Sequence, residues 1–372
     1  MTGPFTFLEF FAGGGMARLG LGGGWRCLFA NDFDAGKRVA YGANFGSDHL
    51  HGGDIHALTI ADLPHQTADL AWASSPCQDL SLAGARGGLG AARSGAFFGF
   101  WRLIEALDDA GRAPRAIVVE NVAGLLTSHD GADFAAVVER LAARGYFVSA
   151  LALNAADFVP QSRLRLFIVG ARADAIGACA AADPLAPPAL LRALTRLSPQ
   201  AMKRWRWIAA RPSAQRTASI GDILDERAVF EPAAETRKRL ALMTPRQRTA
   251  LAALVAGGGR HTGAGYRRVR VEDGVKRVRF EARFDGLSGC IRTPAGGSSR
   301  QVVIAIDQGR VRTRLMTARE AARAMGLADD YVLPARATNA LKLIGDGVCP
   351  PVVRWLAETA LEPALARRCA AA

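Results

Sequence analysis

The chain has 372 residues, of which 50% are hydrophobic and 22% are charged. This balance excludes a disordered or collagen-like chain, and the length predicts one large domain or two of ordinary size. The longest apolar runs are too short to span a bilayer, and the first residues lack the basic segment of a secretory signal. The six cysteines form no CxxC pair, which indicates neither a disulfide framework nor a zinc ribbon. We therefore expect a protein of the reducing cytoplasm that binds no membrane and no metal.

The net charge of +13 is concentrated in one segment. Between Ala186 and Arg300 there are 23 Lys and Arg against 9 Asp and Glu, a net charge of +14, whereas the rest of the chain carries 24 against 25, a net charge of −1. A near-neutral framework with one basic segment suits a polyanion, because neutralised phosphates release counterions. An Arg-rich composition from a GC-rich genome gives the same excess, so charge alone does not decide the partner.

The first half alternates short apolar runs with helical periodicity. Apolar runs occupy residues 5–11, 25–30, 69–73 and 116–119, and each of them ends in glycine-rich or polar residues. Helical patterns fill residues 35–43, 98–107 and 133–144. This alternation predicts an α/β fold with a parallel sheet covered on both faces, whose ligands bind beyond the carboxyl ends of the strands.

The pattern changes after Gly170. Residues 183–188 are rich in Pro and Ala and predict a linker to a second, smaller and basic domain with short alternating strands, such as residues 275–283. Helices are expected again at residues 317–325 and 351–361.

A glycine-rich turn follows the first apolar run. Gly13 and Gly15 let the backbone approach a ligand closely, but Arg18 stands where a dinucleotide fingerprint needs its third glycine, which disfavours NAD and FAD. Asp32, after the second run, is placed to accept hydrogen bonds from a ribose diol, and Phe33 beside it to stack on an adenine. Glycine turns of this kind commonly bind nothing, but the acidic residue at the next strand end favours a nucleoside-containing cofactor.

Three further strand ends carry reactive side chains. Cys77 follows the third run in a Ser-Pro-Cys-Gln-Asp segment, and Glu120 ends the fourth, so a thiolate nucleophile and a carboxylate share one pocket if these strands are neighbours. Arg163 and Arg165 lie on one side of an extended segment and are suited to oxygen acceptors. The alternatives are a small buried cysteine, a solvated Glu120 beside a helix cap, and arginines in surface ion pairs.

In this order the motifs resemble those of the cytosine-C5 DNA methyltransferase family. They are Phe-x-Gly-x-Gly, Pro-Cys-Gln, Glu-Asn-Val, Gln-x-Arg-x-Arg, a basic domain, then Arg-Leu-Met-Thr-x-Arg-Glu from Arg314 and Gly-x-x-Val from Gly345. The resemblance implies a Rossmann-like methyltransferase domain, S-adenosylmethionine as the methyl donor, and a smaller target-recognition domain that faces double-stranded DNA. It also implies that the target cytosine is flipped out of the duplex.

The family's functional positions transfer residue by residue. The resemblance implies catalytic roles for Cys77, Glu120, Arg163 and Arg165, with Cys77 as the nucleophile, Glu120 at N3 and the exocyclic amine of cytosine, and Arg165 at O2. It implies cofactor contacts from Phe11, Gly13, Gly15, Asp32, Phe33, Asp54, Ile55, Pro76 and Asp346, and an apolar contact from Ala96 or Phe97. It implies DNA contacts from Gln78, Gln161, Arg292 and Arg300. Asp346 stands where the family usually has Asn, and a carboxylate accepts but does not donate a hydrogen bond.

Residues 1–182 are expected to form the first part of the catalytic domain, residues 183–316 the recognition domain, and residues 317–372 a segment that returns to the catalytic domain. The predicted enzyme is a DNA (cytosine-5-)-methyltransferase, associated with the nucleoid through its DNA, with a cognate restriction endonuclease as a candidate partner. Two alternatives stay open, an RNA cytosine-C5 methyltransferase and a catalytically silent DNA-binding regulator.

Overall fold

The computed structural model describes residues 4–76, 95–172, 186–208, 216–293 and 300–366. The chain divides into two compact units, the first made of Met1–Leu153, Leu164–Pro212 and Val352–Ala372 and the second of Asn154–Arg163 and Ser213–Pro351. The expected boundary at residue 183 falls inside the first unit, and the one at residue 317 falls inside the second. These units are defined by compactness, so the functional division of the chain stays a prediction.

A seven-stranded sheet in the order β3-β2-β1-β4-β5-β7-β6 forms the centre of the first unit. Its strands are β1 (Phe5–Phe10), β2 (Trp25–Asp32), β3 (Leu50–Gly52), β4 (Leu70–Ala73), β5 (Ala116–Val122), β6 (Phe147–Asn154) and β7 (Leu164–Ala171). The four predicted apolar runs correspond to β1, β2, β4 and β5. These four strands and β3 pair in parallel, so their carboxyl ends meet at one edge of the sheet.

The strand β7, which lies beyond the four strands predicted from the first half, departs from the parallel pattern. This strand pairs with β5 in the antiparallel direction, with Val122 opposite Arg165. Only residues 155–163 separate β6 from β7, too few for the crossover that adjacent parallel strands need. As a result, β7 begins at the edge where the parallel strands end.

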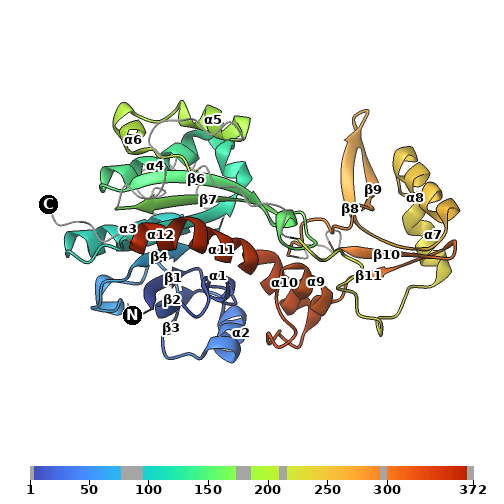
Figure 1. The fold of residues 1–372 in the computed structure, drawn as a ribbon, viewed down its shortest axis with the longest axis horizontal. Coiled ribbons are helices and arrows are strands. Elements are labelled where there is room, and N and C mark those ends of the chain that lie inside the picture. The colour runs from blue at the N-terminus through green and yellow to red at the C-terminus, as the bar shows by residue number, and fades with distance from the viewer. Residues whose placement is uncertain (1–3, 77–94, 173–185, 209–215, 294–299, 367–372) are drawn as a thin grey trace. The chain divides into compact units, whose positions relative to one another are not determined.

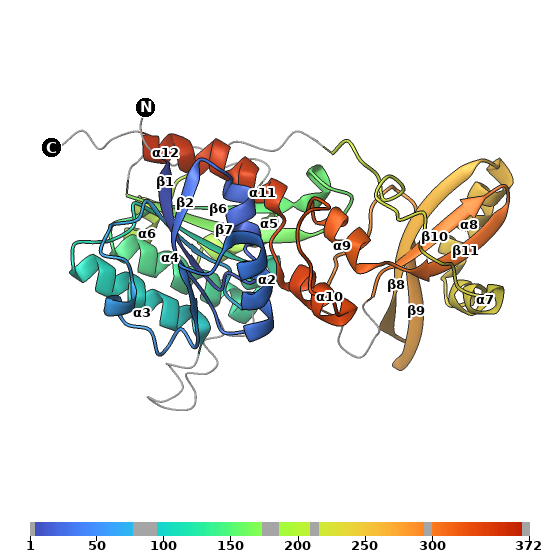
Figure 2. The same ribbon diagram turned by 90° about the horizontal axis from the view of Figure 1, so that it is seen from below.

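Helices cover both faces of this sheet (Figures 1 and 2). They are α1 (Met16–Leu21), α2 (Ala35–Phe45), α3 (Ala96–Asp109), α4 (Ala132–Ala143), α5 (Pro188–Leu194), α6 (Pro199–Arg204), α11 (Pro350–Leu356) and α12 (Glu362–Ala366). Leu8 and Phe10 of β1 share one core cluster with apolar residues of α3 and α4. On the other side α12 is bonded to β2, where the Trp25 indole N–H donates to the Glu362 carboxylate over 2.9 Å. The predicted helix at 351–361 corresponds to α11 and the π-helical turn Ala357–Leu361.

The second unit contains a four-stranded sheet in the order β11-β10-β8-β9. Its strands are β8 (Arg260–Glu272), β9 (Val275–Arg283), β10 (Val302–Asp307) and β11 (Arg310–Leu315), and its helices are α7 (Ala233–Ala241), α8 (Pro245–Gly257), α9 (Ala318–Ala324) and α10 (Ala337–Asp346). Met243 and Leu251 pack on Phe280, Val302 and Ile304 to form its core. The strand predicted at 275–283 is β9. Within the described ranges no helix is long and apolar enough to cross a bilayer.

Candidate active site

The turn after β1 combines strained backbone with open space. Phe11, Gly13 and Gly15 have φ values of 58°, 58° and 74°. A Cβ at Gly15 would lie 2.4 Å from the Phe45 ring, whereas a Cβ at Gly13 would meet no atom within 4 Å. Gly15 is therefore required for packing, while Gly13 leaves its backbone open to a ligand. A left-handed Phe11 is costly, and such strain gathers at functional sites.

Asp32 ties the end of β2 to this turn. One oxygen of its carboxylate accepts from the N–H of Gly13 over 2.8 Å, and the other accepts from the N–H of Asp34 over 2.8 Å. The neighbouring Phe33 ring is 76% exposed, although a large aromatic side chain gains free energy from burial. A fixed carboxylate and an exposed ring thus lie next to each other at the carboxyl edge of the sheet.

Asp54 and Ile55 follow β3 at the same edge. The side-chain amide of Asn31 donates to the carbonyl oxygens of His51 and Gly53, which holds this segment against the end of β2. Ile55 is buried under α3, where a Cβ on Gly99 would lie 2.7 Å from its Cγ2. Asp54 accepts a hydrogen bond from the N–H of His56. The predicted cofactor residues that follow β1, β2 and β3 are thus brought to one edge.

The sequence predicts a shared pocket for Cys77 and Glu120 if the strands that lead to them are neighbours. The corresponding strands, β4 and β5, are parallel neighbours with Ala73 opposite Val119. The side-chain amide of Asn121 donates to the carbonyl oxygen of Ser75 over 3.0 Å, which fixes the segment after β4 against the end of β5. Pro76 is exposed at the end of this segment. Cys77 and Gln78 lie outside the described residues.

Arg165 reaches Glu120 across the antiparallel pair of β5 and β7. The Arg165 Nε lies 3.3 Å from the Glu120 Oε1, and the two side chains are 16% and 9% exposed. An ion pair with so little exposure is weakly screened by solvent. The structure thus brings together two of the four predicted catalytic residues, the carboxylate and the cation.

Gln161, predicted to contact DNA, is fully buried in the second unit. Its Oε1 accepts from the N–H of Ile291 over 2.9 Å, and its Nε2 donates to the carbonyl oxygen of Ala324 over 3.1 Å. A side chain without exposed surface cannot touch DNA, so in this structure Gln161 joins the segment at residue 291 to the end of α9.

Arg163, predicted to be catalytic, is also buried in the second unit. Its guanidinium donates to the carbonyl oxygens of Ile291, Gly345 and Gly347 over 2.9, 3.0 and 2.6 Å. Three carbonyl acceptors from two distant segments make it a positioning residue here. Its catalytic role remains a prediction.

Asp346 ends α10 and accepts a hydrogen bond from the Thr293 hydroxyl. The preceding Gly345 touches the same segment, because a Cβ there would lie 2.4 Å from the backbone nitrogen of Thr293. The backbone at residues 292–293 therefore lies directly against α10. Asp346, which stands where the family usually has Asn, thus already accepts a hydrogen bond from Thr293 within the second unit.

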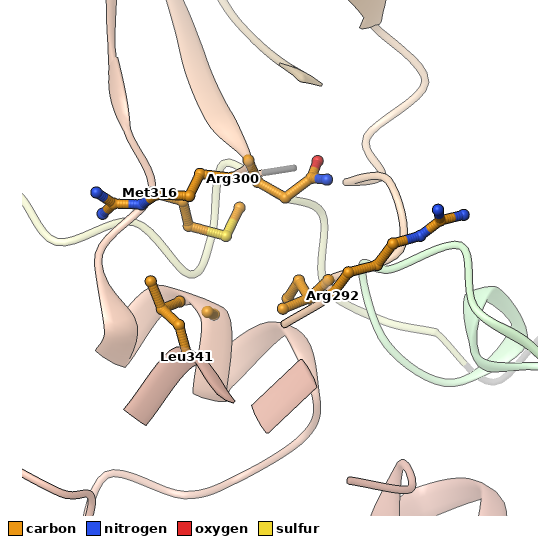
Figure 3. Close-up of a pocket in the computed structure, with 7 residues that line it drawn as sticks. Arg292, Arg300, Met316 and Leu341 are labelled. Carbon is orange, nitrogen blue, oxygen red and sulfur yellow. The ribbon is translucent and has the colours of Figure 1, made fainter. Parts of the chain in front are cut away.

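Arg292 and Arg300 line a hollow in the second unit, together with apolar side chains that include Met316 and Leu341. Figure 3 shows the two arginines on opposite sides of the hollow, with their guanidinium groups directed away from each other. They are thus not poised to contact the same base, and each is available to a separate phosphate or base edge.

Sequence reasoning missed Glu9, a carboxylate that is 1% exposed beneath the glycine turn. Its oxygens accept from the N–H of Arg18 over 3.3 Å and from the Tyr41 hydroxyl over 3.4 Å. Burial raises the pKa of Glu9 to about 8. The sequence does contain a sign of this residue, because Glu9 is an acidic residue inside the apolar run at 5–11. A carboxylate in a buried strand requires specific hydrogen-bond partners.

This shifted pKa predicts a pH-dependent stability. In the unfolded chain the pKa of Glu9 is near its ordinary value of 4.5, so between pH 4.5 and about 8 the folded state binds more protons than the unfolded state. The free energy of unfolding should therefore fall by about 1.4 kcal/mol per pH unit across this window through this group. We expect Glu9→Gln to remove that slope, measured by urea unfolding at several pH values. Parallel curves for the two proteins would contradict the assignment.

Comparison with known proteins identifies the class. The sequence profile of the C-5 cytosine-specific DNA methylase family matches residues 5–362, and the chain belongs to this family. It is a DNA (cytosine-5-)-methyltransferase, and methylation in this family depends on S-adenosylmethionine.

Among curated relatives, the chain is 29% identical to the type II methyltransferase M.NlaX of Neisseria lactamica over 360 residues, which cover 95% of each chain. It is 27% identical to the type II methyltransferase M.HpaII of Haemophilus parainfluenzae, with 96% of this chain and 89% of that one covered. Its fold is similar to the solved structure of the Entamoeba histolytica methyltransferase EhMeth, with a TM-score of 0.65, 13% identity, and coverage of 96% of this chain and 98% of that one.

Proposed function

We propose that this protein transfers a methyl group to C5 of a flipped cytosine within one short sequence of duplex DNA, through a covalent adduct between Cys77 and C6. The observation that supports this most is the buried pair of Glu120 and Arg165, 3.3 Å apart, beside the segment that leads into Cys77. The carboxylate and the cation lie at the sheet edge to which the glycine turn also contributes.

The cofactor residues of the first unit fit a nucleoside. Asp32 presents a carboxylate fixed by two backbone N–H groups, Phe33 offers an exposed ring, and Gly13 leaves the turn open. We infer that these groups hold the ribose, the adenine and the methionine end of S-adenosylmethionine, which supplies an electrophilic methyl group when bound. Asp54 and Ile55 would border the adenine, with Pro76 at the site's rim.

The chemistry requires a nucleophile and two electrostatic partners. The Cys77 sulfur forms a bond to C6, and the electron pair of the C5–C6 double bond becomes available at C5, which takes the methyl group. Glu120 donates a proton or a strong hydrogen bond at N3, and Arg165 stabilises the negative charge at O2. Loss of the C5 proton to a base then restores the double bond and expels the thiolate.

The recognition role belongs to the basic segment. We propose that Arg292 and Arg300 contact guanine edges or phosphates, and that Gln78 contacts the DNA next to the flipped base. Asp346 at the methionine end of the cofactor also remains a proposal. The type II names of the relatives support a restriction-modification setting, in which the partner is an endonuclease that cuts the same sequence.

The first test measures transfer from tritiated S-adenosylmethionine to duplex DNA and, separately, to total RNA, with bisulfite sequencing of the product. We expect methylation of DNA only at C5 of cytosine, within one short motif. We expect Cys77→Ser to abolish this methylation while DNA binding persists. Transfer to RNA alone would favour the RNA enzyme, and cofactor binding without transfer would favour the silent regulator.

A matched control is Cys369→Ser, which changes a thiol outside every motif and should leave the rate unchanged. Duplex DNA with 5-fluorocytosine at the mapped position sharpens the test, because fluorine at C5 cannot leave as a proton. A complex that resists denaturation should form with the wild-type protein and not with Cys77→Ser. A stable complex with both proteins would exclude Cys77 as the nucleophile.

A further inference from the structure

The segment that carries Arg292 is held on its first side by two buried groups of the second unit. The N–H of Ile291 donates to the Gln161 side chain over 2.9 Å, and the carbonyl oxygen of Ile291 accepts from the Arg163 guanidinium over 2.9 Å. Gln161, Arg163 and Ile291 are 0%, 2% and 3% exposed, so solvent competes little for these hydrogen bonds. Both backbone groups of the residue before Arg292 are therefore fixed.

The other side of the segment lies against the end of α10. A Cβ on Gly345 would lie 2.5 Å from the carbonyl carbon of Arg292, so the peptide bond between Arg292 and Thr293 lies directly on the helix backbone. The Thr293 hydroxyl donates to the carboxylate of Asp346, the next residue of α10. Because α10 buries one face, which includes Ile344, its end is a firm support for the segment.

Asp346 strengthens this attachment relative to the asparagine that the family usually has. A hydrogen bond from a hydroxyl to a charged carboxylate is about twice as strong as one to a neutral acceptor. Both oxygens of a carboxylate accept hydrogen bonds, whereas only one side of an amide does. The residue that departs from the family pattern is therefore the better acceptor for the Thr293 hydroxyl.

The side chain of Arg292 is the part of this segment that reaches outward. It is exposed, and Figure 3 shows its guanidinium directed away from that of Arg300. A phosphate contact is the same at every sequence, whereas a bidentate contact to a guanine needs the guanidinium fork in the plane of one base. A contact of fixed geometry requires a fixed backbone beneath the side chain. The attachments on both sides of Arg292 favour this stricter kind of contact.

We propose that Thr293 and Asp346 are a positioning pair that fixes the backbone of Arg292 for a bidentate contact with a guanine edge of the recognised sequence. The inference rests on the proposed action on DNA, and it deepens that proposal by choosing a base edge over a phosphate for Arg292. In this role the pair acts through Arg292 and does not itself touch DNA. A role of Asp346 toward the cofactor alone predicts a different result, because the Thr293 hydroxyl would then not affect sequence recognition.

The test is a double-mutant cycle on sequence discrimination. Discrimination is the Kd of a duplex with one motif base pair changed, divided by the Kd of the mapped duplex, and fluorescence anisotropy measures both for each motif position. Thr293→Val removes the hydroxyl and keeps the branched shape of the side chain, whereas Thr293→Ser keeps the hydroxyl. The matched control is Thr249→Val, which removes a hydroxyl that donates to the carbonyl oxygen of Pro245 within α8.

We expect Arg292→Ala to lower discrimination about 10–100-fold at one base pair, the usual contribution of a bidentate base contact. Thr293→Val and Asp346→Ala should each lower it about 3–10-fold at the same pair, the net contribution of one hydrogen bond. Thr293→Ser and Thr249→Val should discriminate as the wild type does. Arg292→Ala combined with Thr293→Val should discriminate like Arg292→Ala alone, because Thr293 acts only through Arg292.

Additive losses in the double variant would overturn the inference, because Thr293 would then act independently of Arg292. Equal weakening of binding to every duplex by Arg292→Ala would also overturn it and assign Arg292 to a phosphate. Unchanged discrimination in Thr293→Val, with weaker binding of S-adenosylhomocysteine to Asp346→Ala by calorimetry, would assign Asp346 to the cofactor alone.

The failure of this inference is distinguishable from that of the proposed function. If the wild-type protein binds DNA but transfers no methyl group, the proposed function is contradicted, and the preferred motif is selected by binding from random duplexes so that the same cycle is measured. If the wild-type protein methylates DNA and the variants fail the cycle, only the positioning role of Thr293 and Asp346 is contradicted.

Discussion

Replacing Arg314 with methionine is expected to lower the free energy of unfolding by about 3–5 kcal/mol, because it leaves a buried carboxylate without its cation. Arg314 of β11 and Glu320 of α9 are 3% and 0% exposed and make two hydrogen bonds, of 2.7 and 2.5 Å. Burial by itself raises the pKa of Glu320, but Arg314 and the N–H groups of Asp225 and Thr317 hold it below its usual value. Urea unfolding at neutral pH measures the loss.

Two further variants make this result specific. Arg314→Met combined with Glu320→Gln removes both charges and should recover part of the lost stability, because no buried charge is then left unpaired and the Gln side-chain oxygen can still accept a backbone hydrogen bond at the start of α9. Lys238→Met breaks the exposed ion pair with Glu235 and should cost less than about 1 kcal/mol. An Arg314→Met protein as stable as Lys238→Met would show that the buried pair is not required.

Glu120→Gln is expected to lower kcat for DNA methylation by about 10²–10⁴-fold, the usual contribution of a positioned acid or base. Glutamine keeps the shape of the side chain but cannot transfer a proton, and it loses the charge that attracts Arg165 at 3.3 Å. The affinity for S-adenosylmethionine should change little, because the predicted cofactor contacts lie on other strand ends. Single-turnover methylation of the mapped duplex measures the effect.

The control for this prediction is Glu105→Gln, which alters a half-buried carboxylate on α3 of the same unit, paired with Arg144. It should leave kcat within about twofold of the wild type. A Glu120→Gln protein with kcat within tenfold of the wild type would remove the carboxylate from the mechanism. Retained activity in Glu120→Asp, at a reduced rate, would support a proton-transfer role over a purely structural one.

The family motif that begins at Arg314 gains a physical meaning from the structure. Its Arg and Glu form the buried pair, and its Thr317 caps α9 in a reciprocal capping box with Glu320. The pattern of residues identified the motif, but only the fold shows that it serves stability of the second unit. A motif match alone is therefore weak evidence that each of its residues touches a ligand.

The local sequence pattern was enough to predict the strands β1, β2, β4 and β5 and the turn at Gly13 and Gly15. It was also enough to identify the order of motifs that defines the family. These features depend on residues close together in the chain, where apolar periodicity and backbone constraints act directly. The tertiary structure alone decided the direction of β7, the burial of Gln161 and Arg163, and the pairing of Glu120 with Arg165. Arg163 bonds to residues 128–184 positions away, and no local pattern carries such distant partners.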